Sequence, residues 1–272
     1  MQLARDTFAR LRELHADAHC ELVHRNAFEL LVATVLSAQT TDVAVNKITP
    51  ELFSRYPSPA ELSAARPEEV EKILSRMGMF RQKTKSVIGL SQKLMAEHNG
   101  EVPRTLAELV KLPGVGRKTA NVVLGVAFNA PEGVVVDTHV QRISQRLGWT
   151  KNITPEKIEL DLMPLFPRAD WDPLSHVLIF HGRRICFARK PSCLSCKVND
   201  VCSSAFKAEL VGRKPGKPVR VIAKSAAQIS ARKSNTTETA KRVRVISKSP
   251  AQISARKTNT TETAKRPKRG KS

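Results

Sequence analysis

The sequence predicts an all-α fold, and three observations carry this prediction. Apolar residues recur three and four positions apart, which is the spacing of amphipathic helices, over residues 1–17, 28–39, 67–78, 83–100 and 104–114. Helix-breaking residues separate these ranges: Gly100 ends one helix, Pro57 and Pro59 mark a loop, and Pro113 with Gly114 forms a hairpin between two helices. The β-branched run "GVVVDTH" (133–139) is too isolated to predict a sheet.

Composition sets the outer limits of the fold. The chain has 272 residues, 41% of them hydrophobic, which is enough for a proper core of one large or two modest domains. Its formal net charge of +21 indicates attraction to a polyanion, most obviously nucleic acid.

The charge is concentrated in the last part of the chain. Residues 210–272 hold 18 of the 46 Lys and Arg residues but only two of the 25 acidic residues. A polar, basic unit at 219–242 is followed at once by a second copy at 243–266 that differs at three positions. Two such copies bury too little apolar surface to offset chain entropy, so residues 210–272 are expected to be a disordered basic tail.

Nothing in the sequence indicates a membrane or secreted protein. There is no apolar run of about eighteen residues, and the first seventeen residues carry acids and lack a signal core. The five cysteines are an odd number, and four crowd into 186–202, unlike a secreted disulfide framework. We expect an intracellular monomer, bacterial and cytoplasmic at the nucleoid.

The stretch "LPGVGRKTANVVL" (112–124) holds two glycines two positions apart, followed by a basic pair and a helix. The amides of Gly114, Val115, Gly116 and Arg117 would point outward unpaired, which suits a phosphate. Such a hairpin resembles a helix-hairpin-helix element, which occurs in many DNA-binding proteins, and a plain helix-loop-helix turn is the alternative.

Lys118 would lie in the first turn of the helix that follows the hairpin. The positive helix end disfavours its charged form there, and a partly neutral amine is a nucleophile. The alternative is a solvated surface charge.

The run "VVVDTHV" (134–140) places Asp137 directly after buried apolar residues. A carboxylate there can cap the following helix, form an ion pair or act as a catalytic base, and these roles are compatible. His139 is expected to be a structural or DNA-facing residue, since no partner at metal-ligand spacing is visible.

Four of the five cysteines predict a metal or cluster site. Cys186, Cys193, Cys196 and Cys202 have the spacing C-x6-C-x2-C-x5-C, and four thiolates suit zinc or a 4Fe–4S cluster. One short-spaced pair instead of two favours the cluster. Cys20 is expected to be a plain buried or free thiol.

"LSAQTTD" (36–42), the glycine hairpin, "VVVDTHV" and the cysteine spacing together resemble the endonuclease III family of DNA glycosylases, within the helix-hairpin-helix-GPD superfamily. The resemblance covers about residues 1–209 and implies two helical domains flanking a DNA-binding cleft. A six-helix barrel with the helix-hairpin-helix would span 23–132. The iron–sulfur domain would combine 1–22 with 133–209.

The resemblance also implies a chemistry. A damaged base is turned out of double-stranded DNA, Lys118 attacks C1′ of its sugar to form a Schiff base, and β-elimination breaks the strand 3′ to the abasic site. Asp137 would stabilise the cationic sugar. Gln39 would fill the gap that the base leaves. Met79 stands where relatives often carry a leucine wedge, with ordinary core packing as its alternative, and Thr40 replaces a common alanine.

The 4Fe–4S cluster is implied to be structural, with Arg189 and Lys190 of its loop contacting phosphates. The basic tail is expected to tether the protein to DNA. The expected function is a bifunctional glycosylase and abasic-site lyase of base excision repair that removes oxidised pyrimidines. Alternatives are a pyrimidine-dimer or mismatch-specific glycosylase of the same superfamily, or a non-catalytic DNA-binding protein.

Overall fold

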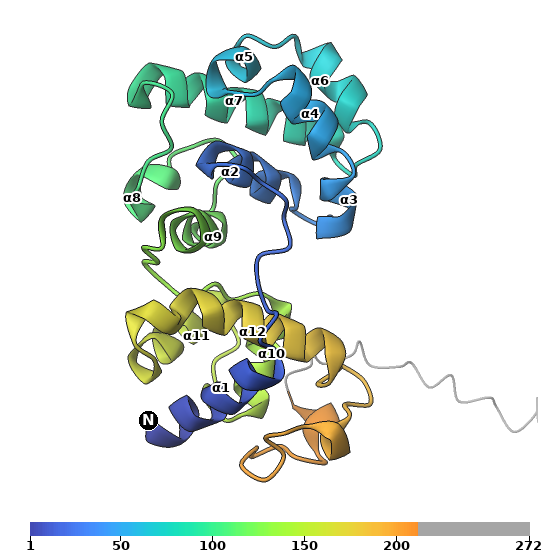
Figure 1. The fold of residues 1–272 in the computed structure, drawn as a ribbon, viewed down its shortest axis with the longest axis vertical. Coiled ribbons are helices and arrows are strands. Elements are labelled where there is room, and N and C mark those ends of the chain that lie inside the picture. Colours follow the sequence, from blue (N-terminus) through green and yellow to red (C-terminus); the bar gives the residue numbers. More distant parts are fainter. Residues whose placement is uncertain (212–272) are drawn as a thin grey trace, which may run out of the picture. The chain divides into compact units, whose positions relative to one another are not determined.

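The structure, a computed structural model, describes residues 1–211, and within them helices are the only regular secondary structure (Figure 1). The predicted all-α fold is therefore confirmed for this part of the chain. The predicted disordered tail lies, from residue 212 on, outside the described residues. The helices, in order, are α1 (Gln2–Leu14), α2 (Ala27–Leu36), α3 (Asp42–Asn46), α4 (Thr49–Arg55), α5 (Pro59–Ser63), α6 (Pro67–Leu74), α7 (Phe80–His98), α8 (Leu106–Leu109), α9 (Arg117–Phe128), α10 (Thr138–Arg146), α11 (Pro155–Leu162) and α12 (Trp171–Arg184), with short 3-10 turns at Met163–Leu165, Arg168–Asp170, Cys193–Ser195 and Ala208–Leu210.

The first of two hydrophobic clusters lies among α2 to α9. Its buried residues run from Leu22 to Leu124. Helix α2 is at its centre: nine of its ten residues are buried, and it packs against α7 and α9. A helix that is apolar all round belongs in a core, so α2 is the element around which the others arrange.

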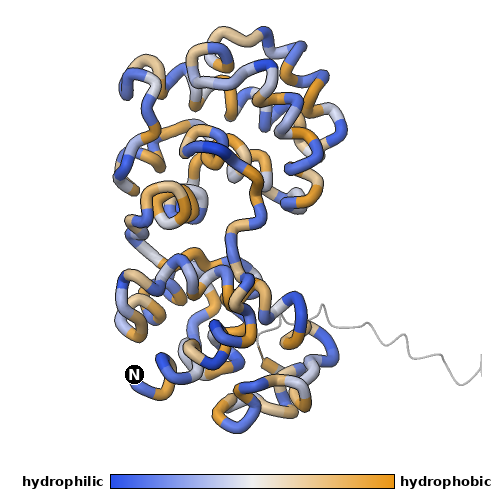
Figure 2. Tube along the Cα trace, in the orientation of Figure 1, coloured by the Kyte–Doolittle hydropathy of each residue, from blue (hydrophilic) through white to orange (hydrophobic). Residues whose placement is uncertain are grey.

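The second hydrophobic cluster joins the two ends of the described chain. Phe8 and Leu11 of α1 pack with Val140 and Ile143 of α10 and with residues of α11 and α12. Figure 1 shows α1, at the start of the chain, beside α10 and α12. Along most helices hydrophobic and hydrophilic residues alternate, as the amphipathic pattern predicts (Figure 2).

Two local expectations were wrong. The range 104–114 holds only the short α8, because Pro113 disfavours helical backbone before it and the chain turns into the hairpin instead. Pro59 does not lie in a loop: it opens α5, where its missing N–H costs nothing and Ser58 caps the helix. None of the helices in residues 1–211 is long and apolar enough to cross a membrane.

Candidate active site

The two glycines of the hairpin meet different surroundings. Gly114 has a φ of +78°, and a Cβ on it would lie 2.8 Å from Cβ of Ser86 on α7. The fold therefore requires a glycine at position 114. Gly116 has no such need, since apart from its chain neighbours no described residue has an atom within 4 Å of the position that a Cβ would occupy. Between them Val115 is 6% exposed and anchors the hairpin in the first cluster. An open glycine on a fixed hairpin leaves room for another backbone to approach.

Helix α9 begins at Gly116 without a side-chain cap. Its first amides are therefore left for an outside acceptor. Arg117 is tied to α11, because its Nε lies 2.8 Å from Oε2 of the buried Glu159, and this carboxylate raises the pKa of the guanidinium. Lys118 is exposed, and its ammonium has no hydrogen bond or ion pair with any described residue. The two neighbouring cations thus differ: Arg117 is held, and Lys118 is available.

Helix α10 begins in the opposite way. Asp137 is its N-cap, and Oδ1 accepts hydrogen bonds from the amides of His139 (2.7 Å) and Val140 (2.8 Å). The cap predicted from sequence is thus confirmed. The buried residues Val134 to Val136 hold the carboxylate in place from the other side. Its second oxygen, Oδ2, has no hydrogen-bond partner among the described residues and remains free for a ligand.

One pocket of about 380 Å³ receives residues from both helix starts. Lys118 and Thr119 of α9, Asp137 and Gln39 all line it, so three of the predicted site residues are brought together. The volume is that of a small-ligand site and is large enough for a nucleoside. The remaining predicted residues do not line this pocket: Met79, Gly114, Val115, Gly116, Arg117, His139, Arg189 and Lys190.

Gln39 and Met79 share an uncommon backbone conformation. Gln39 has a φ of 55° and Met79 a φ of 56°, and both side chains are exposed. For Met79 the exposed fraction is 51%, which excludes core packing as its role. Positive φ in residues other than glycine costs free energy and is found at functional sites when the surroundings enforce it.

The other predicted contact residues lie elsewhere. His139 is half-buried between its own helix α10 and Gly182 of α12. Its Nδ1 lies 3.2 Å from Nη2 of Arg142, also on α10, and burial lowers the pKa of the imidazole. This fits the structural alternative given for it. Arg189 and Lys190 are exposed in the loop that precedes Cys193.

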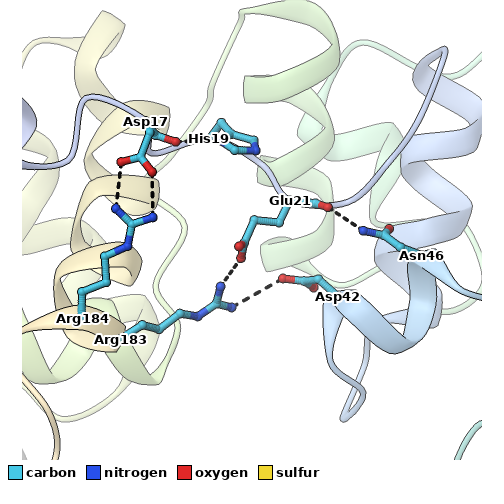
Figure 3. A network of polar contacts seen from close by, with 7 residues as sticks. All are labelled: Asp17, His19, Glu21, Asp42, Asn46, Arg183 and Arg184. Carbon is cyan, nitrogen blue, oxygen red and sulfur yellow. Dashed lines mark hydrogen bonds and ion pairs between the residues drawn. The ribbon is translucent and has the colours of Figure 1, made fainter. Parts of the chain in front are cut away.

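Ion pairs connect the segment between α1 and α2 to α12 (Figure 3). Two of their residues, Glu21 and Arg183, line the pocket. Arg184 pairs with Asp17 through two hydrogen bonds of 2.8 and 2.7 Å. Arg183 pairs with Glu21 and reaches Asp42 of α3, with 3.5 Å between Nη2 and Oδ2. Arg183 therefore links a helix of the second cluster to a helix of the first.

All four cysteines predicted as ligands line a single narrow cavity. Arg146, a buried arginine of α10, also lines this cavity, and the buried Arg142 of the same helix donates hydrogen bonds to the carbonyl of Cys186. Arg146, 1% exposed, donates to the carbonyls of Phe187 (2.7 Å) and Ala188 (3.0 Å) and to Sγ of Cys186 (3.2 Å). Neither arginine has a carboxylate partner among the described residues. Within residues 1–211, no three His, Cys, Asp or Glu side chains are arranged to hold a single metal ion.

Several residues of the site were not found from the sequence. Cys20 lines the pocket, and burial raises its pKa to about 11. The position of Arg183 in the pocket could not be predicted from the sequence, because its two acidic partners, Glu21 and Asp42, are far away along the chain. Lys83 is 4% exposed, and its position did carry a signal: it precedes Val87, Leu90 and Leu94, all buried on α7, at helical spacing.

Comparison with known proteins gives consistent results. Residues 32–168 match the model of the HhH-GPD superfamily of base excision DNA repair proteins. Endonuclease III of Synechocystis sp. is 48% identical over 204 residues, which cover 75% of this chain and 93% of the relative. For endonuclease III of Bacillus subtilis the identity is 44% over 206 residues, with the same two coverages.

Solved structures give the same picture. A trapped covalent intermediate of endonuclease III with DNA superposes with a TM-score of 0.71 at 45% identity, covering 76% of this chain and 97% of that one. A thermostable thymine-DNA glycosylase, at 23% identity and a TM-score of 0.65 over 75% of this chain and 97% of its own, shares the fold.

Proposed function

Because the chain belongs to the endonuclease III family of the HhH-GPD superfamily, we propose that the pocket lined by Lys118 and Asp137 is its active site. The protein is a bifunctional DNA glycosylase and abasic-site lyase of base excision repair. One observation carries the assignment of the site: a lysine and a carboxylate oxygen that have no polar partner within residues 1–211, from two different helix starts, line the same pocket.

We propose the following roles for the two residues. The Lys118 amine attacks C1′ of a nucleotide turned into the pocket, the glycosidic bond breaks, and the base leaves with the electron pair. The C1′–O4′ bond then breaks, O4′ takes up a proton, and the opened sugar is held to Lys118 as a protonated imine. This imine acidifies the C2′ proton, whose loss expels the 3′ phosphate. Water then hydrolyses the imine and releases Lys118. Asp137 Oδ2 stabilises positive charge on the sugar, while the two amides of α10 hold Oδ1.

The DNA backbone is expected to bind at the hairpin. The uncapped start of α9 offers unpaired amides, and the open Gly116 lets a phosphate approach them. Gln39 and Met79 enter the duplex where the damaged nucleotide leaves it. Arg189 and Lys190 contact phosphates farther along, and the protein acts as a monomer on double-stranded DNA.

The cysteine cavity is proposed to hold a 4Fe–4S cluster. The four cysteines and Arg146 line it together, Arg142 donates to the carbonyl of Cys186, and neither buried arginine pairs with a carboxylate of residues 1–211. Two buried cations need a nearby negative charge, which four thiolates on a cluster supply. A cluster also spreads its ligands over four metal atoms, unlike a single ion. Its contribution is structural: it fixes the loop that carries Arg189 and Lys190.

The substrate class is proposed to be oxidised pyrimidines in the DNA of a bacterial cytoplasm. The test is a duplex with a single thymine glycol, incubated with the iron-containing protein and then with borohydride. We expect strand cleavage and a covalent protein–DNA adduct. Lys118→Gln should bind the duplex and give neither product, whereas Lys111→Gln, a change near the same hairpin, should give both. Cleavage by the Lys118 variant would refute the assignment.

A further inference from the structure

Lys83 of α7 is a buried cation whose surroundings call for an explanation. The residue is 4% exposed, and burial lowers its pKa. It lies in the first turns of α7, at the positive end of the helix dipole. No carboxylate pairs with it among the described residues. Both burial and the helix end disfavour its charge, so keeping a lysine here costs stability.

Within residues 1–211, the one polar partner of this ammonium is in another segment. Nζ of Lys83 donates a hydrogen bond of 2.6 Å to Oγ1 of Thr40. Thr40 directly follows Gln39 in the loop between α2 and α3, and Met79 is the N-cap residue of α7 itself. The contact therefore ties the loop of Gln39 to the helix whose start carries Met79.

Gln39 and Met79, two exposed residues in left-handed backbone conformation, are thus connected through one partly buried hydrogen bond. Their φ values of 55° and 56° need support from surrounding structure. The same helix also supports the hairpin, because Ser86, three residues after Lys83, packs against Gly114. Helix α7 consequently begins next to one residue that is proposed to face DNA, Met79, and contacts two further segments that are proposed to do so, the loop of Gln39 and the hairpin.

We propose that Lys83 is a positioning residue: its hydrogen bond to Thr40 sets Gln39 and Met79 at the separation needed to replace a displaced nucleotide. This inference rests on the proposed function, since it assumes that both side chains enter damaged DNA. The contact acts on recognition of the gap and leaves Lys118 and Asp137 untouched.

The experiment separates stability from recognition. Affinity is measured for a duplex with a tetrahydrofuran abasic analogue and for the intact duplex, beside the melting temperature. Lys83→Met removes the buried charge but keeps the volume, so the melting temperature should stay or rise, while the preference for the analogue falls about tenfold because positioning is lost.

Variants of Thr40 complete the cycle. Thr40→Val should lose the preference and also lower the melting temperature, because the ammonium is left buried without a partner. Thr40→Ser keeps the hydroxyl and should keep both properties. The double variant should recover the melting temperature but not the preference. Lys85→Met, an exposed charge on the same helix, should weaken both affinities alike.

Each outcome of these measurements either supports or overturns the positioning role of Lys83. An unchanged preference in Lys83→Met and Thr40→Val, with a wild-type protein that does prefer the analogue, overturns the positioning role alone. The same is true if Lys85→Met lowers the preference as much as Lys83→Met does. A wild-type protein without preference overturns the proposed function as well.

Discussion

The starts of α9 and α10 meet at the same pocket but are built in opposite ways. The N-cap of α9 is Gly116, which has no side chain to accept from the first amides, while the N-cap of α10 is Asp137, whose Oδ1 accepts hydrogen bonds from the amides of His139 and Val140. The first arrangement suits an anion brought by a ligand. The second fixes a carboxylate of the protein's own. The comparison shows that a helix start can bind a ligand or hold a catalytic group, depending on which residue precedes it.

The largest effect should come from removing the charge of Asp137. Asparagine is as good an N-cap as aspartate, so Asp137→Asn should keep the melting temperature but lower single-turnover cleavage by about a thousandfold, since the charge that stabilises the sugar is lost. Asp137→Ala should lose activity too and, with the cap gone, about 1 kcal/mol of unfolding free energy. Equal melting temperatures for the two variants would contradict the capping role.

Cys20, in the wall of the same pocket, should be nearly inert at neutral pH. Its pKa is raised to about 11 by burial, so the reactive thiolate forms only as the pH approaches that value. At pH 8 its alkylation by iodoacetamide should be about a hundredfold slower than that of free cysteine, and should speed up with each pH unit above. Mass spectrometry of the iron-containing protein, with Cys20→Ser as the control, measures this rate. Rapid alkylation at pH 7 would show that the pocket wall opens.

Giving α9 the kind of start that α10 has should weaken DNA binding. Gly116→Asp fits without a clash, caps the helix and places a negative charge where a phosphate is expected, so duplex affinity should fall about tenfold without loss of stability. Gly114→Ala is the matched control: its φ of +78° and the nearby Ser86 should make it lower the melting temperature instead. Normal DNA binding by Gly116→Asp would show that the uncapped start of α9 does not bind a DNA phosphate.

The smallest effect is expected from residues 210–272. Their 18 Lys and Arg residues all lie beyond Val211, whose carbonyl accepts a hydrogen bond from Arg146, and should release counterions on DNA. Deleting residues 212–272 should therefore reduce the slope of affinity against salt concentration and leave cleavage of a bound duplex unchanged. Titration at several salt concentrations gives the slope. An unchanged slope would remove the tether from the account.

Local features were predictable from the sequence, and features that depend on distant partners were not. The hairpin and the start of α10 follow from glycine and aspartate in positions whose effects are local. The pairing of Arg183 with Glu21 and Asp42 joins residues more than a hundred positions apart, and no spacing rule reveals it. Lys83 belongs to a helix that was predicted over residues 83–100, but neither its burial nor its partner Thr40 was predicted. The roles given to Lys118 and Asp137 stay predictions, although both residues line one pocket.

The central claim is that Lys118 is the nucleophile of this pocket. The most direct measurement is to reduce the covalent adduct with borohydride, digest protein and DNA, and locate the sugar remnant by mass spectrometry. We expect the added mass on Lys118 alone. A remnant on another lysine, on Lys83 above all, would contradict the account.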